Sequence, residues 1–207
     1  NTYTTKKTVT KEWDDENNIE GFRPNSITVE LLDNNNEVVR EAKLSDANKW
    51  TYTFTNLSLN EDGKEIKYTV REKEVPEGYT VSYNQDTLSI TNTREVTKTK
   101  KTITKIWDDF NNQDGIRPDS VNVTLYANGD IVNTYTLTKD SNYTLTVSDL
   151  QKNANGELIN YTIEEEIVTG YTASYNQETL TVTNTHTPEV RSINITKEWI
   201  DANNQDG

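Results

Sequence analysis

The 207-residue chain is strongly acidic, with a formal net charge of −13 and a pI near 4.6. We therefore expect no nucleic-acid partner and no membrane contact, because the sequence offers no basic stripe to meet phosphates or anionic lipids. The chain also lacks cysteine, which excludes disulfides and thiolate chemistry, so any covalent stabilisation must use other side chains.

Two similar copies organise the chain, from about residue 5 to 93 and from about 99 to 185. The segment KTVTKEWDD from Lys7 returns as KTITKIWDD from Lys101. A third copy opens at Ile193 with INITKEW and stops at Gly207, which indicates a piece of a longer array. We predict domains at 1–96 and 97–188, followed at 189–207 by the first strand of a truncated third repeat.

Each copy consists of short runs in which apolar residues alternate with polar ones, a pattern typical of β-strands. In the first copy we expect strands near residues 6–13, 26–32, 37–43, 50–56, 66–74, 79–84 and 87–93. In the second we expect them near 101–107, 120–126, 131–137, 143–147, 160–166, 171–175 and 179–185. Polar turn clusters separate the runs, and no useful helical stretch appears. The pattern predicts an all-β fold with a sandwich of about seven strands in each copy.

Three polar residues in each copy occupy the inward phase of their strands, where an apolar residue is expected. They are a lysine in the first strand, a glutamate in a late strand and an asparagine in the last strand: Lys11, Glu72 and Asn92, then Lys105, Glu165 and Asn184. Successive side chains alternate between the faces of a strand, so this phase directs all six into the core. The spacings are nearly equal, 61 and 20 residues in the first copy against 60 and 19 in the second.

This set of side chains can form a covalent bond if the three strands are neighbours. Burial lowers the lysine pKa and raises the glutamate pKa, so both groups move toward their neutral forms. A neutral Lys11 amine could attack the Asn92 carboxamide carbon and release ammonia, which leaves an isopeptide bond. Glu72 would donate a hydrogen bond to the carboxamide oxygen and carry protons during the reaction.

The same residues also allow an interpretation without chemistry. Lys11 could extend its ammonium to solvent from a strand end, Glu72 could pair with it as an ordinary salt bridge, and Asn92 could bond a turn. Strand phase alone leaves the two interpretations about equal. The return of the same three residue types in the second copy favours the covalent one.

The segments VTKEW, RP, YTVREKEVPEGY and ITNT resemble the Cna B-type repeat of Gram-positive surface adhesins and pilins. The resemblance covers both complete copies and the start of the third. It implies a reverse immunoglobulin-like (prealbumin-like) β-sandwich with an isopeptide bond from Lys11 to Asn92 and a catalytic role for Glu72. For the second copy it implies Lys105, Asn184 and Glu165, which lies between Glu164 and Glu166.

Other candidate sites are weaker. The polar run from Asp109 to Gly115 is out of register with a calcium-binding loop, so we expect a polar turn there. His186 is the only histidine and lies in a connector, which leaves no base for triad or metal chemistry. We expect no cofactor and no metal. The aromatic residues in phase with the apolar faces are expected in the core rather than in a sugar-binding platform: Trp13, Trp50, Tyr52, Phe54, Trp107 and Trp199.

The resulting expectation is a structural protein rather than an enzyme, because its only chemistry is internal and occurs once. The resemblance implies stalk or spacer repeats of an adhesin anchored to the cell wall on the bacterial surface. The expected partners are neighbouring repeats of the same chain and, through another domain, a host extracellular matrix protein. The alternatives are a module that itself binds a host protein or glycan and, ranked lower, a polymerised pilin shaft.

Overall fold

The computed structural model describes residues 4–200 and 203–205. The chain forms two compact units, the first made of residues 1–100 with 148–159 and the second of 101–147 with 160–207. The domain boundaries expected near residues 96 and 188 remain predictions.

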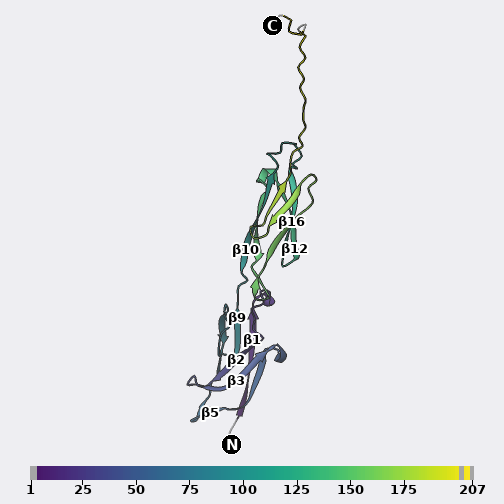
Figure 1. Cartoon of the computed structure of the whole chain (residues 1–207). Coiled ribbons are helices and arrows are strands. Elements are labelled where there is room, and N and C mark those ends of the chain that lie inside the picture. Colours follow the sequence, from purple (N-terminus) through teal and green to yellow (C-terminus); the bar gives the residue numbers. More distant parts are fainter. Residues whose placement is uncertain (1–3, 201–202, 206–207) are drawn as a thin grey trace. The chain divides into compact units, whose positions relative to one another are not determined.

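The first unit is a sandwich of two sheets (Figure 1). The four-stranded sheet has the order β4 (Thr51–Ser58), β1 (Thr4–Asp14), β9 (Ser89–Thr93), β8 (Thr80–Asn84). The three-stranded sheet has the order β3 (Val38–Ser45), β2 (Ser26–Leu32), β7 (Thr69–Glu72). The polar cluster after β4, expected as a turn, forms a small hairpin of β5 (Asn60–Glu61) and β6 (Lys64–Glu65), and short 3₁₀ turns span Glu16–Asn18 and Asp46–Asn48.

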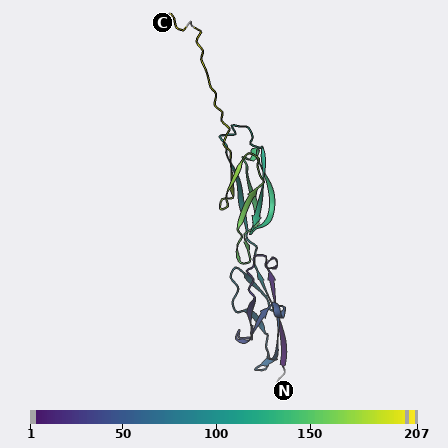
Figure 2. The same ribbon diagram turned by 45° about the vertical axis from the view of Figure 1, so that its right-hand side comes forward.

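The second unit is also built of β-strands (Figure 2). It repeats the strand order of the first. Its four-stranded sheet is β13 (Thr144–Gln151), β10 (Lys98–Asp108), β18 (Thr181–Thr185), β17 (Thr172–Asn176). Its three-stranded sheet is β12 (Asp130–Thr138), β11 (Ser120–Ala127), β16 (Tyr161–Glu165), with a 3₁₀ turn at Lys139–Ser141. The short hairpin of β14 (Asn153–Ala154) and β15 (Glu157–Leu158) belongs to the first compact unit. The prediction of tandem β-sandwiches with about seven main strands each is confirmed.

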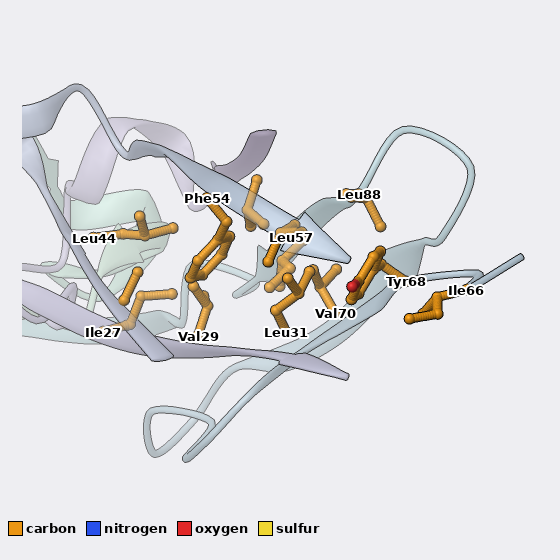
Figure 3. Packing of buried hydrophobic residues seen from close by; sticks show 13 residues of the cluster. Ile27, Val29, Leu31, Leu44, Phe54, Leu57, Ile66, Tyr68, Val70 and Leu88 are labelled. Carbon is orange, nitrogen blue, oxygen red and sulfur yellow. The ribbon is translucent and has the colours of Figure 1, made fainter. Parts of the chain in front are cut away.

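The core of the first unit lies between its two sheets. Val29 and Leu31 of β2 are fully buried and face Phe54 and Leu57 of β4 (Figure 3). Val70 of β7 lies beside them. Burial of such side chains is worth roughly 1.5–3 kcal/mol each. This packing allows an otherwise polar chain to fold.

The first and last main strands of each unit lie side by side and run parallel. In the first unit, β1 pairs with β9 so that Lys11 is opposite Ile90 and Trp13 is opposite Asn92. The pairing of β10 with β18 has the same register, with Trp107 opposite Asn184. The lysine and the asparagine therefore lie on one inward face, two register positions apart, on adjacent strands.

Two aromatic predictions need correction. Tyr52 is paired with Val9 and so lies on the expected face, but its strand β4 is at the edge of its sheet, and the ring stays 44% exposed beside Phe54. Trp199 is 70% exposed, because residues 187–200 form no strand and so provide no sheet to cover it (Figures 1 and 2). Phe54 is buried as predicted, and Trp13 and Trp50 pack against the core.

A group that we call the terminal clasp follows the last strand of each unit. In the first unit, Arg94 donates from Nε to Glu20 Oε2 (2.9 Å) and from Nη1 to the Gly78 carbonyl (3.2 Å). Gly78 has a φ of +77°, and a side chain there would collide with the Arg94 guanidinium. The clasp thus joins the end of β9 to two loops.

The second unit builds the same clasp with a titratable residue. His186 Nε2 lies 3.0 Å from Asp114 Oδ2, and Nδ1 lies 2.8 Å from the Gly170 carbonyl oxygen. Both partners accept hydrogen bonds, so the ring satisfies both only when both nitrogens carry a proton. The hydrogen bond to Asp114 accordingly raises the His186 pKa above its ordinary value.

We expect the stability of the second unit to fall as the pH rises through the His186 pKa. A raised folded-state pKa stabilises the fold below the unfolded pKa of about 6.5, and this contribution is lost above the folded-state value. Thermal unfolding of the full chain between pH 5.5 and 9 measures the effect, with His186→Arg as the control that keeps the charge. Equal pH dependence in the two proteins would contradict the assignment.

Candidate functional site

The first unit brings Lys11, Glu72 and Asn92 together inside the sandwich. Lys11 and Asn92 come from the four-stranded sheet, and Glu72 comes from β7 of the facing sheet. Their exposed fractions are 4%, 5% and 0%, respectively. Asn92 Nδ2 donates to Glu72 Oε1 at 3.3 Å. The carboxamide nitrogen therefore faces Glu72, whereas the sequence argument expected the oxygen there.

The second unit brings together Lys105, Glu165 and Asn184 in the same way. Lys105 Nζ lies 3.6 Å from Glu165 Oε1, and Asn184 is fully buried. Glu165 is 7% exposed, while its neighbours Glu164 and Glu166 are on the surface. Of the three consecutive glutamates, Glu165 alone points into the core because neighbouring side chains of a strand face opposite ways.

Burial shifts the lysines and glutamates toward their neutral forms. Desolvation lowers the pKa of Lys11 to about 8, against the opposing charge of Glu72. Desolvation likewise lowers the pKa of Lys105 to about 8, with Glu165 opposing it. The pKa of Glu72 and that of Glu165 are both raised by burial. Both shifts favour the neutral amine and the protonated carboxyl over their charged forms.

The surroundings leave the reactive groups under-satisfied. Lys11 Nζ donates to the Glu12 carbonyl at 2.7 Å and lies 3.8 Å from the centre of the Trp13 ring. Among the described residues, Asn92 Oδ1 and Asn184 Oδ1 are buried without a hydrogen-bond partner. In general, a buried polar atom without a partner costs about 1–3 kcal/mol of stability.

A charged network beside the site was not predicted. In the first unit, buried Asp15 accepts from Arg23 Nε (3.0 Å) and from the Tyr79 hydroxyl (2.9 Å). Arg23 also lies over the Trp13 ring, 5.4 Å from its centre, and its charge contributes to the lowered Lys11 pKa. The sequence carries a signal for it, because the RP and GY pairs recur in both copies.

The second unit has an equivalent network. Asp109, 1% exposed, accepts from Arg117 Nε and from the Tyr171 hydroxyl, both at 2.9 Å. Its Oδ1 also accepts from the backbone of Asn112, which closes the turn that follows β10. In the polar run from Asp109 to Gly115, the first carboxylate therefore binds Arg117 and closes a turn.

The sequence profile of the Cna protein B-type domain matches residues 7–93 and 101–185. The chain belongs to this family. It is 41% identical over 206 residues to the collagen adhesin of Staphylococcus aureus, covering 98% of this chain but only 17% of the adhesin. It is also similar to the crystal structure of two B repeat units of the collagen-binding protein of S. aureus, with a TM-score of 0.72 and 39% identity. That match covers 89% of this chain and 50% of the other.

The two matched ranges divide the chain into two repeats of the same family. The chain is a tandem pair of Cna B-type repeats, similar to those of a bacterial surface adhesin. No helix among the described residues is long and apolar enough to cross a membrane. Each of the two sets of buried polar residues lies within one matched range.

Proposed function

We propose that each B-type repeat locks itself with an isopeptide bond, Lys11 to Asn92 in the first and Lys105 to Asn184 in the second. The supporting observation is the burial of a lysine, a glutamate and an asparagine together in both repeats. Parallel neighbouring strands hold each lysine beside its asparagine, and the glutamate approaches from the facing sheet.

In the proposed reaction, the neutral Lys11 Nζ attacks the Asn92 Cγ atom and the carbonyl oxygen takes up the negative charge. Glu72 accepts a proton from the attacking amine and delivers one to Asn92 Nδ2, which faces it. The C–Nδ2 bond then breaks, ammonia leaves, and a secondary amide remains. Holding both reactants in place can supply roughly 7–11 kcal/mol of the barrier.

The chemistry happens once in each repeat, so the chain is not an enzyme. We propose that the locked repeats serve as a stalk or spacer in a surface adhesin, anchored to the cell wall in the full-length protein. Similarity to B repeats of a collagen-binding protein supports this role. On this proposal the contact with a host extracellular matrix protein belongs to another domain.

The intact mass of the denatured chain tests the crosslinks. We expect a deficit of two ammonia masses in the wild type, with one mass restored in Glu72→Ala and one in Glu165→Ala. Glu164→Ala and Glu166→Ala are matched controls, because these exposed neighbours should leave the deficit unchanged. An unshifted wild-type mass would overturn the proposal.

A further inference from the structure

The strand that carries the glutamate lies at an open edge of its sheet. Among the described residues, β7 of the first repeat pairs only with β2, and β8 of the other sheet pairs only with β9. In the second repeat, β16 and β17 are placed in the same way. The backbone groups on the outer side of β7 and β16 therefore have no strand to bind, and side chains or water must satisfy them.

One glutamine in each repeat bonds this edge at two points. Gln85 Oε1 accepts from the Val70 backbone N–H at 2.8 Å, and its Nε2 donates to the Val70 carbonyl at 3.0 Å. Gln177 makes the same two contacts with Ile163, at 2.8 and 3.0 Å. A primary amide carries one acceptor and a donor group side by side, so it imitates the edge of a neighbouring strand.

A tyrosine adds a third contact at the glutamate itself. The Tyr83 hydroxyl accepts from the backbone N–H of Glu72 at 3.3 Å, and Tyr175 does the same for Glu165 at 3.2 Å. Tyr83 belongs to β8 and Tyr175 to β17, the strands that lead into the turns holding the two glutamines. Both repeats thus fix the glutamate strand with the same pair of side chains.

These contacts connect the glutamate to the asparagine through a short path. Strand β8 is paired with β9, where Val81 is opposite Asn92. Glu72 follows Val70 by two residues and therefore points to the same face of β7. Gln85 therefore connects β7, which carries Glu72, to the β8–β9 hairpin, which carries Asn92.

We propose that Gln85 and Gln177 are positioning residues of the crosslinking reaction, which hold Glu72 and Glu165 opposite the carboxamides of Asn92 and Asn184. This inference rests on the proposed isopeptide function. The glutamines touch no reacting atom and act only through the strand they bond. Displacing a catalytic group by about 1 Å can slow a reaction on the order of a hundredfold.

The test measures the rate of crosslinking in the full chain. A short pulse of cell-free synthesis is stopped in guanidinium, the chain is diluted into buffer, and samples are quenched at intervals for mass analysis of the digested protein. We expect Gln85→Met to slow formation of the Lys11–Asn92 bond about tenfold to a hundredfold and to leave the Lys105–Asn184 bond unaffected. Gln177→Met should do the reverse, and Asp86→Asn, in the same turn as Gln85, should change neither.

The pH dependence of Gln85→Glu tests whether the two-point contact with Val70 controls the rate of crosslinking. A protonated carboxyl offers one donor and one acceptor like the amide, whereas a carboxylate cannot donate to the Val70 carbonyl. The rate of Gln85→Glu relative to wild type should therefore approach one at pH 5 and fall about tenfold or more by pH 8. A constant ratio, or a wild-type rate in Gln85→Met, would overturn the positioning role while the wild-type crosslinks remain. A wild type without crosslinks would instead overturn the proposed function and this inference with it.

Discussion

Lys11→Met is expected to lower the melting temperature of the first repeat by roughly 20 °C or more. The bond would close a loop of about 80 residues. Without it the unfolded chain regains conformational entropy, which lowers the free energy of unfolding by about 4–5 kcal/mol. For a domain of this size, each kcal/mol corresponds to about 4–8 °C. Calorimetry of the full chain gives the measurement, and the unchanged second repeat serves as an internal reference.

The same variant distinguishes a covalent bond from a buried ion pair. Methionine fills a volume similar to that of the lysine stem and removes the charge, and replacing a buried ion pair by apolar groups is often neutral or stabilising. Lys105→Met provides the matched experiment in the second repeat. A melting temperature within a few degrees of the wild type in both variants would contradict the crosslink.

Arg117→Met is expected to destabilise the second repeat by about 3 kcal/mol. The substitution removes the guanidinium that bonds Asp109 and leaves a carboxylate that is 1% exposed. Loss of one partner of a buried pair costs about 3–5 kcal/mol, and the lower end applies because the Arg117 side chain is 23% exposed. Urea unfolding of the full chain measures the difference.

We expect acid to remove the stability that the Asp109–Arg117 pair gives to the second repeat. The Arg117 hydrogen bonds hold the Asp109 pKa well below its ordinary value. A depressed folded-state pKa stabilises the fold above the unfolded pKa of about 3.9, and this contribution disappears as the pH falls toward the folded-state value. The double variant Asp109→Asn/Arg117→Met should be less acid-sensitive than the wild type between pH 5 and 2. Equal sensitivity would show that this pair does not govern the acid response.

The alternation of apolar and polar residues was enough to predict the sandwich and the inward direction of Lys11, Glu72 and Asn92. Both follow from the two-residue period of a strand, which is a local property. Which strands become neighbours is not local. The parallel pairing of β1 with β9, which sets Trp13 opposite Asn92, depends on contacts between residues about 80 positions apart.

The predictions that were wrong or missing also depended on contacts between residues far apart in the sequence. The phase of Tyr52 was correct, but its exposure depends on β4 being an edge strand, which only the sheet order reveals. The network of Asp15, Arg23 and Tyr79 joins two loops, and alternation carries no information about loops. The two-point contact of Gln85 with Val70 was missed because a polar residue in a turn is ordinarily assigned to solvent.

The parallel pairing of first and last strands also determines how much length a repeat can release under load. A force applied to the two ends of a repeat acts at the start of β1 and at the end of β9. It therefore shears these two hydrogen-bonded strands past each other. With Lys11 joined to Asn92, the load passes directly from one strand to the other and bypasses the chain between them. At about 3.4 Å per residue, roughly 270 Å of contour in each repeat would then stay unavailable to extension, and a crosslinked array would keep its length at forces that unravel an ordinary sandwich.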